Sequence, residues 1–224
     1  MIRVIKDNRF FFTVAGIWVI AGLCLLLFIP HGHEVLWLNQ NRTPAADVFF
    51  RFWTRLGEPV AYIVCIFLLL FVRYRSAVLI PAIGISVTLI SFLAKAWFHQ
   101  DRPFPFFSKA GLWEQFNPVE GVRLLGGANS FPSGHSTSAF ALFTFVALNL
   151  AGKRGPGIVL ALTAIFVAVS RIYLLQHFLR DVVFGSVLGM LIGLSFYLIQ
   201  VSLSRRPGHW LDGKLRIPAR KETA

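Results

Sequence analysis

The chain has 224 residues, of which 56% are apolar, 15% aromatic and 14% charged, and its mean hydropathy is +0.66. Soluble domains carry about 25% charged and about 45–50% apolar residues, so this composition excludes a disordered chain, a coiled coil and a typical water-soluble enzyme. Basic residues outnumber acidic ones by 22 to 10. They stand in short clusters between apolar runs, which favours membrane orientation and anionic head groups over nucleic acid.

Six apolar segments follow one another and predict an all-α, integral-membrane bundle of six transmembrane helices. The first segment follows three basic residues, as in a signal peptide, but no small-residue cleavage site follows it, so we expect an uncleaved span. The second is shorter and starts with Glu58-Pro59. Together the spans leave no length for a separate soluble domain, so residues 1–224 are predicted to form one membrane-embedded domain. The six segments are residues 10–29, 57–72, 76–94, 136–152, 155–170 and 182–204.

The distribution of basic residues predicts an orientation with both termini in the cytoplasm. The inner side then receives very short basic loops and a basic tail over residues 205–224. The outer side receives two long segments. In residues 30–56, aromatic and basic side chains alternate, which predicts an amphipathic helix in the membrane interface or, alternatively, a loop packed on the bundle. Residues 97–134 are predicted to form a long outer loop, and such irregular segments are usually functional.

Three groups of polar residues stand at the outer ends of the last four spans. Charged side chains at such positions are costly near lipid, so each of them needs a reason. Considered alone, each Arg could be an anchor at the membrane surface, and each His could be a side chain packed within the protein. All three groups fall on one side of the membrane in the predicted topology, however, so we expect them to form one site. The groups are Lys95 with Arg102-Pro103, then Pro132-Ser133-Gly134-His135, then Ser170-Arg171 with His177 and Asp181.

The second group is suited to binding an anion. Ser133 is expected to cap a helix that begins near Gly134. The free N–H groups of such a helix start attract phosphate, and Gly134 lets a ligand approach the backbone closely. His135 then lies in the first turn, beside the anion. A capped helix with a structural His is the alternative for this group alone.

The third group can supply a nucleophile. His177 and Asp181 are four residues apart, so the carboxylate can hold one ring nitrogen and leave the other free to attack. Arg171 is out of phase with His177 on one straight helix, which predicts a break at about residues 174–176. Arg171, Lys95 and Arg102 provide three cationic groups, and guanidinium groups bind phosphate oxygens in pairs.

The pattern K-x6-RP, then PSGH, then SR-x5-H-x3-D resembles the motifs of the type 2 phosphatidic acid phosphatase superfamily. The motifs cover residues 95–181, and the predicted spans extend the resemblance over almost the whole chain. The resemblance implies that His177 is a nucleophile forming a phosphohistidine, that Asp181 orients it, and that His135 protonates the leaving oxygen. It also implies metal-independent chemistry with no cofactor, in which the phosphoryl oxygens are held by Lys95, Arg102, Ser133, Gly134 and Arg171.

We therefore expect a phosphatase of the bacterial inner membrane that acts on a lipid phosphate or pyrophosphate, with its site facing the periplasm. The candidate substrates are undecaprenyl pyrophosphate, phosphatidylglycerol phosphate, phosphatidic acid and a lipid A phosphate, since the motifs bind the phosphoryl group that all four share. One alternative is a lipid phosphotransferase with the same site. Another is a non-enzymatic transporter of anions or lipids, which predicts polar residues deep within the spans. The sequence indicates no nucleic-acid or obligate protein partner, and His31 and His33 lack a third metal ligand.

Overall fold

The computed structural model of this chain describes residues 2–150, 154–204 and 210–216. Its regular elements in these ranges are all helical, which confirms the predicted all-α class. The longer helices are α2 (Arg9–Phe28), α5 (Pro59–Leu70), α6 (Tyr74–Phe98), α8 (Gly134–Asn149), α9 (Arg154–Tyr173) and α10 (Leu179–Leu203). The shorter elements are α1 (Ile2–Asp7), α3 (His33–Gln40), α4 (Pro44–Thr54), α7 (Pro103–Lys109), and the 3₁₀ turns η1 (Arg55–Gly57), η2 (Trp113–Gln115) and η3 (Trp210–Asp212).

The number of membrane spans differs from the prediction. Four stretches are long and apolar enough to cross a membrane. The number rises to at most five if α4–η1 and α5, which are bent by 61° relative to each other, form one broken span. The predicted six are not confirmed, because α8 has 16 residues. At about 1.5 Å per residue it is about 24 Å long, shorter than a hydrocarbon core of about 30 Å. Residues 151–152 of that predicted span lie outside the described residues.

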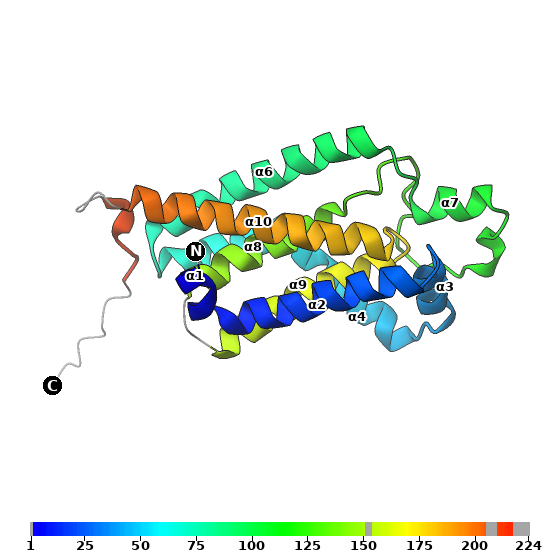
Figure 1. The fold of residues 1–224 in the computed structure, drawn as a ribbon, viewed down its shortest axis with the longest axis horizontal. Coiled ribbons are helices and arrows are strands. Elements are labelled where there is room, and N and C mark those ends of the chain that lie inside the picture. Colours follow the sequence, from blue (N-terminus) through cyan, green and yellow to red (C-terminus); the bar gives the residue numbers. More distant parts are fainter. Residues whose placement is uncertain (1, 151–153, 205–209, 217–224) are drawn as a thin grey trace.

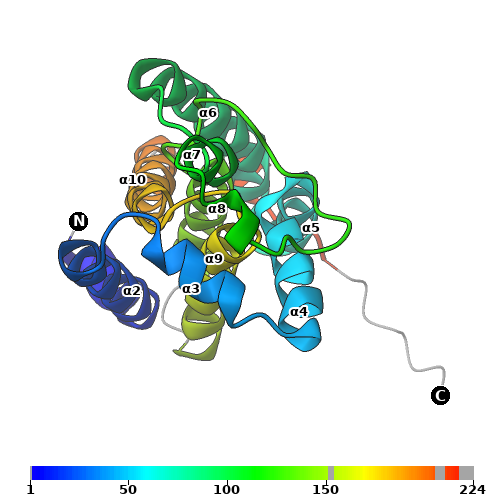
Figure 2. The same ribbon diagram turned by 90° about the vertical axis from the view of Figure 1, so that its right-hand side faces the viewer.

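Helix α8 is the centre of the bundle, surrounded by α6, α9 and α10 (Figure 2). Its side chains from Ser136 to Leu148 are all buried. The outward faces of the other helices instead expose large apolar side chains, as expected of surfaces in contact with lipid. Examples are Ile17, Ile20 and Leu27 of α2, Ile85, Leu89 and Phe92 of α6, and Leu191 of α10.

Close packing of α10 on α8 depends on glycines. A Cβ atom added to Gly189 would lie 2.4 Å from the carbonyl oxygen of Thr137, and one added to Gly193 would lie 2.5 Å from that of Ala141. Only a residue without a side chain fits at such a distance, as in other closely packed membrane helices. The glycines of α10 therefore fix its separation from α8.

The two ends of the bundle carry different parts of the chain. Helix α1 and the last turn of α10 lie at one end, whereas α3, α7 and the start of α8 lie at the other (Figure 1). The described part of the predicted basic tail packs at the first end, where Arg75 forms an ion pair with Asp212 at 3.1 Å. Residues 205–209 and 217–224 of that tail lie outside the described residues.

The two long segments predicted on the outer side lie at the second end (Figure 1). Residues 30–56 include α3 and α4, and the aromatic face of α4 packs on α9, where the rings of Phe49 and Trp53 lie 5.3 and 4.9 Å from that of Phe166. Of the two predicted alternatives, the segment is helical, as expected of an amphipathic helix, and it is packed on the bundle, as expected of the packed loop. Residues 97–134 contain α7 and η2.

Candidate active site

The residues predicted to form a site come together at this second end of the bundle. Lys95 lies in the last turn of α6, and Arg171 in the last turn of α9. Arg102 precedes α7, Ser133 to His135 begin α8, His177 precedes α10, and Asp181 lies in the first turn of α10. Lys95, Arg102, Arg171 and His177 all lie close enough to His135 to interact electrostatically with its ring.

A break between α9 and α10 positions His177, and this break confirms the one predicted at residues 174–176. Helix α9 ends at Tyr173 and α10 begins at Leu179. Within the break, Leu175 adopts a left-handed conformation with φ of 58°. The backbone N–H of His177 donates to the carbonyl oxygen of Arg171 at 3.1 Å. The turn therefore brings His177 back beside Arg171, although six residues separate them along the chain.

His177 is paired with Asp181 as the four-residue spacing predicts. The Nδ1 atom of His177 lies 3.5 Å from Oδ2 of Asp181. That carboxylate oxygen also accepts hydrogen bonds from the hydroxyl of Ser130 at 2.5 Å and from the backbone N–H of Phe178 at 3.0 Å. Since these contacts involve Nδ1, the Nε2 atom of His177 is the ring nitrogen left for chemistry.

The environment of His177 keeps its imidazole neutral. Burial lowers the pKa of His177 from 6.5 to about 3, against the opposing effect of the Asp181 carboxylate. Its side chain is only 2% exposed. A neutral ring retains a lone pair on Nε2, which a nucleophile requires.

The start of α8 has the predicted cap. The Oγ atom of Ser133 accepts from the backbone N–H of Ser136 at 3.4 Å and from its hydroxyl at 3.0 Å. The backbone N–H of Ser133 donates to the carbonyl oxygen of Asp181 at 3.0 Å, which ties the beginnings of α8 and α10 together. Apart from the adjacent residues and the backbone of α8 itself, no described heavy atom lies within 4 Å of where a Cβ of Gly134 would be, so there is free space beside this helix start.

Two of the three predicted cations, Arg102 and Arg171, are held in place by neutral groups. Arg102 donates to Oδ1 of Asn129 at 2.6 Å and to the carbonyl oxygen of Gln176 at 3.2 Å. Arg171 donates through Nη1 to Oγ1 of Thr54 at 2.6 Å. Within the described ranges, neither these two arginines nor Lys95 forms an ion pair with a carboxylate. The region therefore has positive charge available for an anion.

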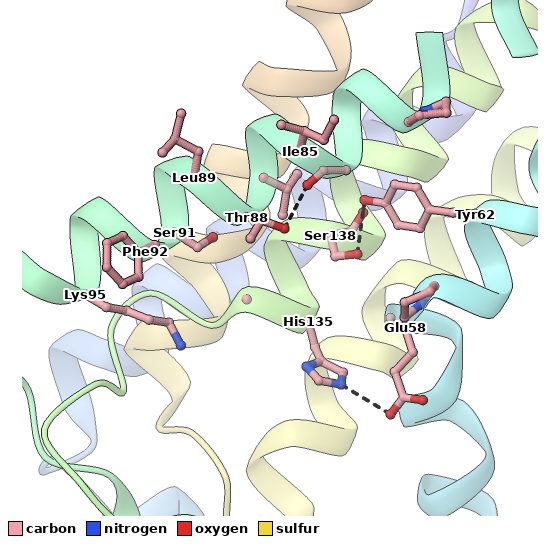
Figure 3. Close-up of a pocket in the computed structure, with 16 residues that line it drawn as sticks. Glu58, Tyr62, Ile85, Thr88, Leu89, Ser91, Phe92, Lys95, His135 and Ser138 are labelled. Carbon is pink, nitrogen blue, oxygen red and sulfur yellow. Dashed lines mark hydrogen bonds and ion pairs between the residues drawn. The ribbon is translucent and has the colours of Figure 1, made fainter. Parts of the chain in front are cut away.

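A cavity of about 920 Å³ leads away from the helix start between α5, α6 and α8 (Figure 3). Its polar end contains Lys95, His135 and Glu58, and Nε2 of His135 lies 3.6 Å from Oε1 of Glu58. Ile85, Leu89 and Phe92, which are exposed on α6, line its open side. The cavity thus joins a charged end to an apolar wall at the surface of the bundle.

Metal ligands do not gather in the described part of the chain. No group of three or more His, Cys, Asp or Glu side chains there is arranged to hold a metal ion. The ring of His31, one of the residues considered for a metal, lies 4.1 Å from that of Phe178.

Several residues of this region were not singled out from the sequence. Ser130, Thr54 and Glu58 each contact a predicted site residue. Ser130 and Thr54 are uncharged residues outside the motifs, and nothing in the pattern distinguishes them. Glu58 had a signal: it is a carboxylate at the end of an apolar segment, where a charge needs a reason.

Comparisons with known proteins identify the family. A sequence model of the PAP2 superfamily matches residues 75–205, more than half of the chain. The chain therefore belongs to the PAP2 superfamily, and its apolar helices make it a multi-pass membrane protein.

Two relatives come from Porphyromonas gingivalis. Its lipid A 4'-phosphatase is 26% identical over 191 residues, which are 79% of this chain and 74% of the relative. Its lipid A 1-phosphatase is 39% identical over 82 residues, which are 36% of this chain but only 18% of that relative.

Two solved structures have a similar fold. The crystal structure of Aquifex aeolicus LpxE is 26% identical, with a TM-score of 0.62, over 75% of this chain and 94% of that one. The phosphatidylglycerolphosphate phosphatase of Bacillus subtilis is 20% identical, with a TM-score of 0.63, over 92% of this chain and 99% of that one. At this identity, the second comparison concerns the fold alone.

Proposed function

We propose that the protein hydrolyses a phosphate or pyrophosphate group of a membrane lipid through a phosphohistidine intermediate, without a metal ion. The observation that carries this proposal is the cavity with Lys95 and His135 at one end and an apolar wall along α6. A phosphoryl group at the charged end leaves the lipid chain against the apolar wall. The lipid A 4'-phosphatase activity named for a relative supports a lipid substrate.

The first step forms a covalent intermediate. Nε2 of His177 attacks phosphorus, so that an N–P bond forms while the P–O bond to the lipid breaks. Asp181 keeps the ring oriented and stabilises its positive charge. Nε2 of His135 faces Glu58, so the other ring nitrogen, Nδ1, gives its proton to the leaving oxygen.

The second step restores the enzyme. Water gives a proton to His135 and attacks phosphorus, the N–P bond breaks, and inorganic phosphate leaves. Throughout, the negative charge on the phosphoryl oxygens is balanced by fixed donors, whose positions require no reorganisation during the reaction. These donors are Lys95, Arg102, Arg171, the hydroxyl of Ser133 and the backbone N–H of Gly134.

The physiological substrate class is an anionic lipid of the cell envelope. Undecaprenyl pyrophosphate, phosphatidylglycerol phosphate, phosphatidic acid and a phosphate of lipid A all present the same terminal phosphoryl group. We place the protein in the inner membrane of a bacterium, with both termini cytoplasmic and the site at the periplasmic surface, because the basic residues cluster on the side of the termini.

Phosphate release by the purified protein tests the proposed function. We expect inorganic phosphate from at least one of the four lipids, at a rate that EDTA does not change, and no release by His177→Ala. Absence of phosphate with all four lipids, or a strict requirement for a divalent metal, would contradict the proposal. Transfer of phosphate to a second lipid without free phosphate would identify a phosphotransferase instead.

A further inference from the structure

The bend between α4 and α5 approaches the site from outside the three motifs. Helix α4 with η1 meets α5 at an angle of 61°. Thr54, before the bend, accepts the hydrogen bond from Arg171, and Glu58, after it, faces His135. Gly57 lies between them, and a Cβ there would be 2.8 Å from Val167 and 3.1 Å from the ring of His135. The bend is thus packed directly against two residues of the proposed site.

Glu58 does not cap the helix that it precedes. It precedes α5 as its N-cap, but its side chain makes no capping hydrogen bond. The carboxylate instead points toward His135 (Figure 3), with Oε1 3.6 Å from Nε2. That nitrogen is buried and has no hydrogen-bond partner among the described residues. In Figure 3 the other ring nitrogen of His135 points away from Glu58, on the side of Lys95.

The charges around His135 make this carboxylate significant. The groups acting on the ring are Arg171 of α9, Lys95 of α6, Arg102 before α7, and His177 before α10. Burial, and after it the positive charges of Arg171, Lys95 and Arg102, oppose a proton on His135, yet a general acid must carry one. A carboxylate that faces Nε2 at 3.6 Å favours the ring orientation in which Nδ1 faces the phosphoryl group.

We propose that Glu58 is a positioning residue that keeps the ring of His135 oriented, with Nδ1 toward the phosphoryl group, for proton transfer to the leaving oxygen. This inference rests on the proposed function. Glu58 does not touch the substrate; it acts through His135. Its effect is therefore confined to the steps in which His135 gives or takes a proton.

Two substrates with different leaving groups test this role. The alkoxide leaving from dioctanoyl phosphatidic acid needs a proton, whereas the nitrophenolate leaving from p-nitrophenyl phosphate does not. The kcat/KM value reports the steps up to release of the leaving group. With phosphatidic acid, we expect Glu58→Gln to lower kcat/KM by roughly 10-fold. This is part of the roughly 100-fold or more that general acid catalysis contributes. With p-nitrophenyl phosphate, we expect kcat/KM to fall by less than about twofold.

The controls separate this role from a structural one. Glu114→Gln changes an exposed carboxylate in η2 and should leave both values unchanged. Thermal unfolding of Glu58→Gln should match that of the wild type, because the two side chains have the same shape. An equal loss with both substrates, or no loss with either, would overturn the role of Glu58. A wild-type protein that releases phosphate from none of the four candidate lipids would overturn the proposed function and this inference with it.

Discussion

Arg171 illustrates how single residues of the site combine burial with charge. Its side chain is 7% exposed, and only Nη1 has a partner among the described residues, the hydroxyl of Thr54. Its Nε is buried without a partner. A buried donor without a partner is costly. In the proposed function, a phosphoryl oxygen would satisfy this donor.

The substitution Arg171→Lys should therefore impair catalysis despite keeping the charge. An ammonium group cannot contact Thr54 and two phosphoryl oxygens in the same plane. Loss of one charge-assisted hydrogen bond of about 1.5–3 kcal/mol predicts a fall in kcat/KM of roughly 10- to 100-fold. Arg51→Lys, on the exposed face of α4, is the matched control and should retain the wild-type rate. An unchanged rate in Arg171→Lys would mean that the guanidinium group does not bind the phosphoryl oxygens.

The buried ring of His177 predicts a dependence of stability on pH. Its pKa is lowered from 6.5 to about 3 by burial, so between these values the unfolded chain binds more protons than the folded one. The free energy of unfolding should fall as pH drops below 6.5, by up to about 1.4 kcal/mol per pH unit. The loss in melting temperature from pH 7.5 to pH 5 should therefore be smaller in His177→Asn than in the wild type.

The control for this pH experiment is His99→Asn, since His99 is exposed at the end of α6. Its left-handed backbone, with φ of 45°, also suits Asn. This variant should lose as much melting temperature as the wild type. Equal losses in His177→Asn and the wild type would mean that His177 is not held neutral by burial.

At the scale of elements, the separation of α8 and α10 sets the geometry of the site. Helix α8 carries Ser133 and His135 near its start, and α10 carries Asp181. A Cβ at Gly189 would lie 2.4 Å from a backbone oxygen of α8, so Gly189→Ala must push the two helices apart. Such overpacking costs typically about 1–3 kcal/mol.

We expect Gly189→Ala to lower both the melting temperature and the rate of phosphate release. Gly16→Ala is the matched control, because a Cβ at this position in α2 would meet no described atom within 4 Å apart from its chain neighbours and the backbone of its own helix. It should be neutral or slightly stabilising, since Ala favours the helix more than Gly. If the two variants unfolded at the same temperature, the close contact of α8 with α10 would not be a stabilising feature of the fold.

The elements that sequence could predict are those with a local signal. The cap at Ser133 and the break before His177 follow from residue type and helical phase, and both are confirmed. The bend between α4 and α5 falls at Gly57-Glu58-Pro59, where Gly and Pro mark a helix boundary, but its contacts with Val167 and His135 depend on packing. For the same reason, the contacts of Thr54 and Ser130 could not be predicted from spacing.

At the scale of the whole molecule, hydropathy predicted the class of fold better than the number of spans. An apolar stretch such as residues 136–152 looks the same whether lipid or protein surrounds it. In the structure the side chains of α8 are buried by other helices, so its apolar character reflects a protein core. The ribbon places α1 at one end of the bundle and α3 and α7 at the other (Figure 1).

Cysteine labelling tests this arrangement in the membrane. With Cys24 and Cys65 replaced by Ala, single cysteines at exposed positions Lys6→Cys in α1 and Ser108→Cys in α7 mark the two ends of the bundle. In intact cells with a permeable outer envelope, an impermeant maleimide should label Ser108→Cys but not Lys6→Cys. Labelling of both positions, or of Lys6→Cys alone, would contradict the proposed orientation.

The most direct measurement is capture of the phosphorylated enzyme. The purified protein is mixed with a lipid substrate labelled in its terminal phosphate and quenched within milliseconds in alkali, where an N–P bond to imidazole survives. We predict label on His177 in the wild-type protein and none in His177→Ala. Phosphate release at the full rate without any labelled histidine, or label on another residue, would contradict the account.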